Sequence, residues 1–156
     1  MKIYTSYFYQ LRFFTPNMIP VSTAVWDPKW YHDFKGQGHV FVDKRGVVNG
    51  LRAEALHPAR DLDGECHGRE GCTQQPSSCR FLKAYREQLS RIDTLECVRR
   101  LYKLGQKMKS VMKFDGDPVI VLMVHEARTN PCSERGPLQD WLNSYGFKCE
   151  EWKGAL

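Results

Sequence analysis

An unbroken apolar run extends from Val119 to Val124, and two polar residues, His125 and Glu126, follow it directly. A run this short and uniform is typical of a strand that is buried on both faces in the middle of a parallel sheet. A loop around Asn130 comes next, and a helical pattern follows the loop. In open α/β sheets, ligands bind at the carboxyl ends of the strands, where such loops lie. The pattern therefore predicts an α/β fold with a functional site just beyond residue 124.

Further strands are predicted where β-branched and aromatic residues dominate, at 3–9, at 18–25, in a hairpin over 40–48, and at 147–152. Helices are predicted where apolar residues recur at helical spacing, over 81–92, from Asp93 or Thr94 to 112, and through Leu138, Trp141, Leu142 and Tyr145. Gly105 interrupts the second helical pattern, and Pro137 indicates a kink or a fresh start in the third. We expect one α/β domain over residues 1–156, with a mostly parallel sheet.

Apolar periodicity is lost between residues 58 and 78, and three cysteines occur within or directly after this stretch at C-x5-C and C-x6-C spacings. These are Cys66, Cys72 and Cys79, and their thiolates could hold a metal, zinc in preference to an iron–sulfur cluster, with His57, His67 or a distant cysteine as the fourth ligand. The spacing is wider than in zinc knuckles. Reduced thiols or a disulfide are the alternatives, and a cysteine count does not separate them.

Composition and charge restrict the class of protein and its partners but do not indicate a function. No apolar stretch is long enough to cross a bilayer, and the start of the chain lacks the pattern of a signal peptide. We therefore expect a cytoplasmic protein with reduced thiols and no membrane partner. The net charge of +5 is compatible with an anionic ligand, but it is too small and too dispersed to indicate nucleic acid by itself.

Candidate ligand-binding residues follow the predicted strands, and each also has a structural interpretation, in which rings cap the core and charges are solvated. They are Ser6, Tyr7 and Arg12 near the first strand, Trp26, Lys29 and Trp30 in an aromatic loop, Asn49 and Arg52 after the hairpin, and Arg135. Aromatic rings stack on flat ligands such as nucleobases, and arginine pairs with phosphate. The set points to a nucleotide-like or other phosphorylated ligand.

Two stretches resemble the bacterial, archaeal and phage family called domain of unknown function four-eight-eight. One is the opening from Ile3 through Arg12, with Ile19-Pro-Val-Ser and Pro28-Lys-Trp-Tyr; the other is Glu126 followed by Cys132 and a helix with Trp141. The resemblance implies a compact Rossmann-like, three-layer α/β fold, in which residues 33–80, the hairpin and the cysteine-rich insert, are an elaboration. The chain departs from the family at Val124, where members commonly have cysteine, and at Ser133 and Glu134, where they commonly have His-Arg.

Three hypotheses for function follow. The first is a module that binds the phosphorylated ligand. The second is an enzyme acting on a nucleotide or nucleic-acid base through Cys132, whose thiol pKa a helix N-terminus would lower, with His125 or Glu126 as base. The third is a metal-stapled protein of phage or mobile-element origin that binds protein or nucleic acid. We favour the first, because no complete catalytic set is evident; the pattern leaves the oligomeric state open.

Overall fold

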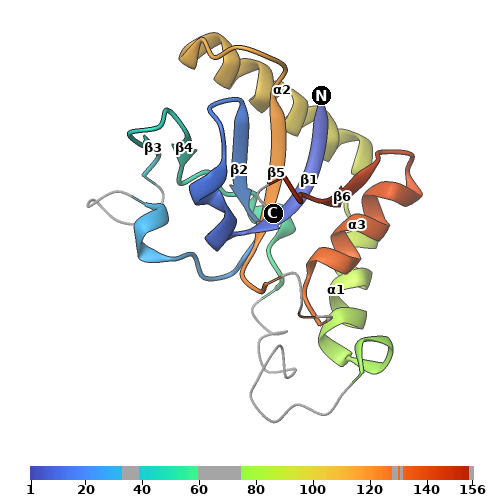
Figure 1. The fold of residues 1–156 in the computed structure, drawn as a ribbon. Helices are drawn as coiled ribbons and strands as arrows, with labels where there is room; N and C mark the ends of the chain where they lie inside the picture. Colours follow the sequence, from blue (N-terminus) through green and yellow to red (C-terminus); the bar gives the residue numbers. More distant parts are fainter. Residues whose placement is uncertain (33–38, 60–74, 128–129, 131, 155–156) are drawn as a thin grey trace.

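The computed structural model describes residues 1–32, 39–59, 75–127, 130 and 132–154. Its centre is a four-stranded sheet in the order β2-β5-β1-β6, and every neighbouring pair of strands is parallel (Figure 1). The strands are β1 (Lys2–Tyr7), β2 (Met18–Ser22), β5 (Val119–Val124) and β6 (Cys149–Glu151). The fold is thus α/β with a parallel sheet, which confirms the fold class expected from the sequence.

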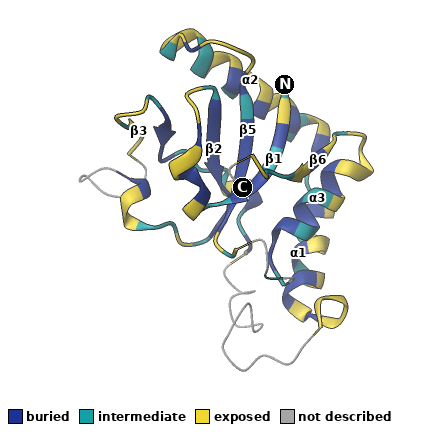
Figure 2. Cartoon of the chain, in the orientation of Figure 1, coloured by how far each residue is buried: buried dark blue, intermediate teal, exposed yellow. Residues whose placement is uncertain are grey.

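β5 is the interior strand that the apolar run predicts. Ile120, Leu122 and Val124 pack into a core on the helical side of the sheet, whereas Val121 and Met123 pack into a second core on the opposite side. All five are fully buried, because layers of structure cover both faces of the strand (Figure 2). An alternating pattern is absent from the sequence for that reason, since alternation marks a strand with one solvated face.

Three helices form the layer on one face: α1 (Arg80–Ser90), α2 (Thr94–Met112) and α3 (Arg135–Ser144). The Asp93 side chain caps α2 by accepting a hydrogen bond from the Glu96 amide at 3.1 Å, as the sequence predicts. α2 continues through Gly105, because this glycine lies where the helix meets the start of β1: a Cβ there would come within 2.5 Å of the Met1 side chain and 3.1 Å of Pro118. Gly105 therefore serves close packing and does not break the helix.

The opposite face is covered by short 3-10 segments, and a hairpin lies beside the edge strand β2 (Figure 1). They are η1 (Phe8–Phe13), η2 (Lys29–Tyr31), β3 (Phe41–Val42) and β4 (Val48–Asn49). Gly46 turns the hairpin with a φ of 84°, as expected, and Arg45 ties it to η1 through the Leu11 carbonyl at 3.0 Å. Two further 3-10 turns are η3 (Glu54–Leu56) and η5 (Pro76–Ser78). Together the helices, the sheet and this covering make three layers.

Several predicted boundaries were wrong. β1 ends at Tyr7 because η1 begins there, and β2 ends at Ser22 because the Thr23 hydroxyl and amide turn back to the Met123 carbonyl, each at 3.0 Å. Pro137 lies in the first turn of α3, so the helix starts afresh and is not kinked. Tyr145 lies outside α3 and is exposed. None of the described helices combines the length and apolar composition needed to cross a bilayer.

Candidate functional site

The carboxyl ends of β1 and β5 form a topological switch point. β1 and β5 are neighbours in the sheet, but the chain leaves them in opposite directions: from β1 through η1 to β2, and from β5 through α3 to β6. η1 packs on one face of the sheet and α3 on the other. In open parallel sheets, such a divergence leaves a crevice between the two strand ends, and ligands bind there. The residues just beyond 124, where the sequence predicts a site, lie at this point.

Aromatic and polar side chains gather at this switch point. Tyr7 and Val124 are partners in the sheet register, so Tyr7 and His125 lie at the ends of adjacent strands. The buried ring of Phe8 lies beneath both the exposed His125, at 6.4 Å between ring centroids, and the exposed Trp30, at 6.3 Å. Two residues chosen from the sequence, Trp30 and His125, are thus brought together on Phe8, whereas Tyr7, at the neighbouring strand end, packs against the core on the helical side and lies near Arg135.

Arg135 is buried beside the candidate site, where it binds neighbouring protein groups and does not present its charge to solvent. Its Nε donates to Glu151 Oε1 at 2.9 Å, its Nη2 to the Glu126 carbonyl at 2.6 Å and its Nη1 to the Ala127 carbonyl at 2.7 Å. The Arg135 and Glu151 side chains are 9% and 10% exposed, and the guanidinium lies 5.7 Å from the Tyr7 ring centroid. Arg135 therefore fastens the loop after β5 to the edge of the sheet.

The loop orientation that Arg135 imposes has a chemical consequence. A trans peptide directs its carbonyl and its N–H to opposite sides, and no described peptide bond is cis. Because the Glu126 carbonyl points at the guanidinium, the Ala127 N–H points away from it, at an exposed residue. A backbone N–H group is a hydrogen-bond donor, so the Ala127 N–H is a candidate donor for an anion.

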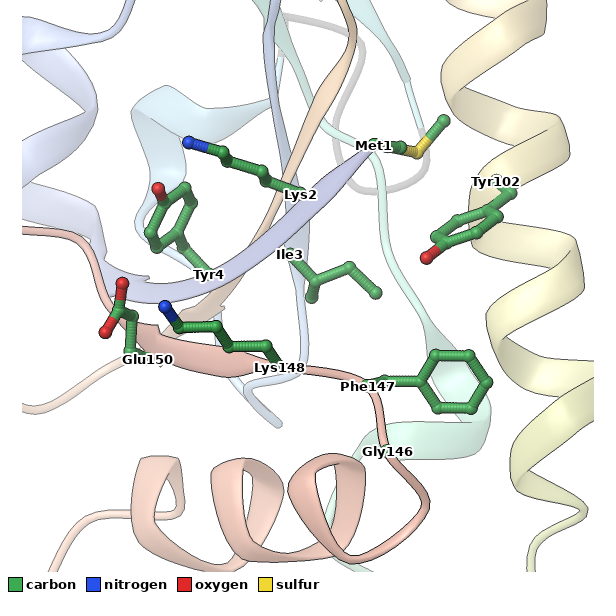
Figure 3. Close-up of a pocket in the computed structure, with 9 residues that line it drawn as sticks. All are labelled: Met1, Lys2, Ile3, Tyr4, Tyr102, Gly146, Phe147, Lys148 and Glu150. Carbon is green, nitrogen blue, oxygen red and sulfur yellow. The ribbon is translucent and has the colours of Figure 1, made fainter.

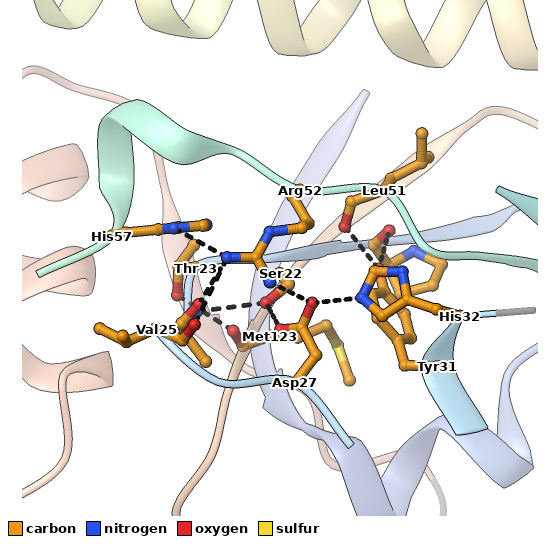
Figure 4. A network of polar contacts seen from close by, with 12 residues as sticks. Ser22, Thr23, Val25, Asp27, Tyr31, His32, Leu51, Arg52, His57 and Met123 are labelled. Atoms are coloured by element: carbon orange, nitrogen blue, oxygen red, sulfur yellow. Dashed lines mark hydrogen bonds and ion pairs between the residues drawn. The ribbon is translucent and has the colours of Figure 1, made fainter. Parts of the chain in front are cut away.

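A second polar network lies at the end of β2 (Figure 4). The Asp27 carboxylate is fully buried and accepts hydrogen bonds from Ser22 Oγ, from His32 Nε2 at 2.7 Å and from Arg52 Nη1 at 2.5 Å. Arg52 also donates through Nη2 to His57 Nδ1 at 3.1 Å. Arg52, a candidate ligand residue, thus anchors the segment after the hairpin to the loop after β2.

The His57 position predicts a pH effect on stability. Arginine only donates, so His57 Nδ1 must accept from Arg52 and the ring must be neutral. Burial, and then the charge of Arg52, lowers the pKa of His57. The unfolded chain therefore binds the proton more readily, so this contribution to stability is complete above pH about 6.5 and is lost as the pH falls toward the folded-state pKa.

We expect the free energy of unfolding, measured with urea, to decrease between pH 7 and pH 5, and the decrease to be smaller in His57→Gln, whose amide oxygen can still accept from Arg52. His39→Gln changes an exposed histidine and should retain the full decrease. Equal decreases in the wild type and His57→Gln would show that His57 does not contribute.

The other candidate residues take several positions. Arg12 and Lys29 are exposed on η1 and η2, and Trp26 is exposed beyond β2. Ser6 is buried, and its hydroxyl has no partner among the described residues. Asn49 is buried and braces the hairpin by donating to Asp43 Oδ2 at 3.2 Å and to the Val47 carbonyl at 3.1 Å. Asn49 and Arg52 therefore act within the fold, whereas Arg12 and Lys29 lie on its surface.

The cysteines do not form a catalytic group with His125 in the described part of the chain. Cys132 precedes α3 and packs with Cys79, Phe81 and Leu82 on the helical side, whereas the His125 ring lies against Phe8 on the other side.

Burial raises the pKa of Cys149 to about 12 and also raises the pKa of Cys97, so these two thiols stay protonated. Cys66 and Cys72 lie outside the described residues. Within the described ranges, no three His, Cys, Asp or Glu side chains are grouped as metal ligands would be.

Glu151, Thr5, Asp27 and His32 were not singled out in the sequence. Thr5 donates to Glu151 Oε1 at 2.7 Å and accepts from Gln139 Nε2 at 2.7 Å. Thr5 and Glu151 are 146 positions apart, so no local pattern connects them. Asp27 precedes a proline and has the appearance of an ordinary loop residue, since Asp-Pro is typical of turns.

A hollow of about 220 Å³ lies at the opposite, amino-terminal edge of β1, between α2 and the start of β6 (Figure 3). Ile3, Phe147 and Tyr102 line its apolar part, and Lys2 and Lys148 lie at its rim. A second hollow lies between the amino-terminal turns of α1 and α3, and a third lies further along the same two helices. Of the candidate residues, these three hollows include Cys79 alone in their lining.

Comparison of the chain with models of protein families, with curated proteins and with solved structures gives no match.

Proposed function

We propose that the chain binds a nucleotide-like or other phosphorylated small ligand at the switch point between the ends of β1 and β5. The observation that carries this proposal is the opposite departure of the chain from these two neighbouring strands, since such a crevice is the usual ligand position in parallel sheets. The resemblance to family four-eight-eight agrees with the proposal in fold alone, and membership of that family stays a prediction, as does a cytoplasmic location.

The side chains at this point suit a ligand with a flat ring and an anionic group. Trp30 and His125 expose rings that Phe8 supports from below, and exposed rings stack on nucleobases. The Ala127 N–H and the His125 ring offer donors for phosphate oxygens. Because Arg135 and Glu151 hold the loop in place, these donors need little reordering when the ligand binds.

The enzyme hypothesis receives less support. Cys132 and His125 pack against different cores, so a nucleophile activated by this base lacks a structural basis. Glu126 contributes its carbonyl to the Arg135 network, which is a positioning role.

The proposal is tested by thermal shift with adenosine monophosphate, ribose 5-phosphate and inorganic phosphate. Binding to the folded state alone stabilises it, by about 2.7 kcal/mol when the ligand is at a hundred times its Kd. At least one of the phosphorylated compounds should raise the Tm of the wild type, and His125→Ala and Trp30→Ala should reduce that shift. Tyr145→Ala removes an exposed ring just beyond α3 and is the control. If no compound raises the Tm at millimolar concentration, or if His125→Ala and Trp30→Ala retain the full shift, the proposal is wrong.

A further inference from the structure

η1 and η2 lie in the same layer of the molecule, and both carry exposed aromatic rings. Tyr9, Phe13 and Trp30 are 53%, 47% and 52% exposed. Isolated exposed rings are common and need no explanation, but a group of large exposed rings on adjacent segments marks an interaction surface. The two segments are adjacent because Phe8 of η1 contacts both Trp30 and Tyr31 of η2, at 6.3 and 5.2 Å between centroids.

These rings are held in place before any partner binds. Trp30 lies edge-on to Tyr31 at 6.5 Å, and the buried Tyr31 hydroxyl donates to the Leu51 carbonyl at 2.7 Å. On η1, Tyr9 is nearly parallel to Tyr7, with a 16° angle between the rings, and contacts Phe13 edge-on at 6.3 Å. A partner that stacks on fixed rings loses little binding free energy to ordering them.

Positive charge accompanies the rings. The Arg12 guanidinium lies 3.9 Å over the Tyr9 ring, and Lys29, next to Trp30, has no ion-pair partner among the described residues. The two acidic residues of this layer that the structure describes are engaged: Asp43 pairs with Arg45 at 2.9 Å, and Asp27 is buried against Arg52. The ring surface is therefore cationic.

We propose that this surface, formed by Tyr9, Arg12, Phe13, Lys29 and Trp30, binds single-stranded nucleic acid. Bases stack on Trp30 and Phe13 and on the outer face of the planar Arg12 guanidinium, which the Tyr9 ring holds in place, while Arg12 and Lys29 contact the phosphates. A duplex does not fit this chemistry, because its base faces are already stacked. The inference rests on the proposed function, since Trp30 belongs to both sites, and extends it: the ligand is a strand that continues from the switch point over η1.

The test is fluorescence anisotropy of the full chain with a labelled oligothymidylate of about a dozen nucleotides, compared with thymidine monophosphate. Stacking contributes about 1–3 kcal/mol per base, which is a factor of about 5 to 150 in Kd. We expect the oligomer to bind at least tenfold more tightly than the monophosphate, and Tyr9→Ala and Trp30→Ala each to weaken it about fivefold or more. Added salt should also weaken binding. Tyr145→Ala, which removes an equally exposed ring beyond α3, should bind as the wild type does.

Other outcomes overturn the inference in distinguishable ways. If the monophosphate binds as tightly as the oligomer, the proposal of a small ligand stands and the inference of single-stranded nucleic acid is wrong. If the oligomer fails to bind while adenosine monophosphate raises the Tm, the same conclusion holds; if neither binds, both proposals fall. Displacement of the oligomer by polyglutamate at equal charge concentration would show that charge acts without stacking. Urea unfolding of each variant checks that the exposed substitutions leave the fold intact.

Discussion

Replacing Asp27 by alanine is expected to lower the free energy of unfolding by about 3–5 kcal/mol, because the Arg52 guanidinium is left buried without its carboxylate. The substitution also removes the acceptor of the Ser22 hydroxyl and of His32 Nε2. Unsatisfied buried donors add to the loss. Urea unfolding at pH 7 measures the effect, and a loss below about 1 kcal/mol would mean that the network is solvated rather than buried.

Two controls separate the buried charge from other causes. Arg86→Ala breaks an ion pair with Asp140 at 2.7 Å whose side chains are 48% and 66% exposed, and it should change the free energy of unfolding by about 0–1 kcal/mol. The double variant Asp27→Ala, Arg52→Met removes both charges and should be more stable than Asp27→Ala alone. If the double variant is the less stable of the two, packing of the Arg52 stem, and not its charge, dominates.

The parts of the fold that the sequence predicts correctly depend on local patterns. The apolar run of β5, the cap at Asp93 and the turn at Gly46 are all encoded within a few neighbouring residues. Gly105 shows the limit of such patterns. Its local effect is to weaken a helix, but contact with Met1 and Pro118, which are distant in sequence, decides its role.

For the candidate site, the sequence predicts which strand ends lie side by side but not the contacts there, and a ligand site at this position stays a prediction. The carboxyl end of β5 was identified from its abrupt polar boundary, and the parallel sheet places Tyr7 beside it. The roles of Arg135 and Arg52 were not predictable, because their carboxylate partners, Glu151 and Asp27, lie 16 and 25 positions away. An arginine in a sequence has the same appearance whether it points to a ligand or anchors a loop, and the tertiary partners alone distinguish the two.

Arg135→Met should lower the free energy of unfolding by about 3–5 kcal/mol, since Glu151 then keeps its charge in a buried position. Methionine replaces much of the side-chain volume, so the loss reports on charge and hydrogen bonds more than on packing. The free energy of unfolding of Arg135→Lys should lie between those of Arg135→Met and the wild type. An ammonium is a point charge and cannot bind Glu151 and the carbonyls of Glu126 and Ala127 at the same time.

The matched control for Arg135→Met is Arg99→Met, which breaks a pair with Glu96 on the surface of α2 and should have little effect. Adding Glu151→Gln to Arg135→Met should recover part of the loss, because the remaining side chain is neutral and still accepts from Thr5. Ligand binding gives the decisive second measurement. If Arg135 positions the loop, Arg135→Lys should weaken binding of a phosphorylated compound at temperatures where the variant is fully folded. Unchanged affinity in that folded variant would show that the orientation of the loop after β5 does not matter to the site.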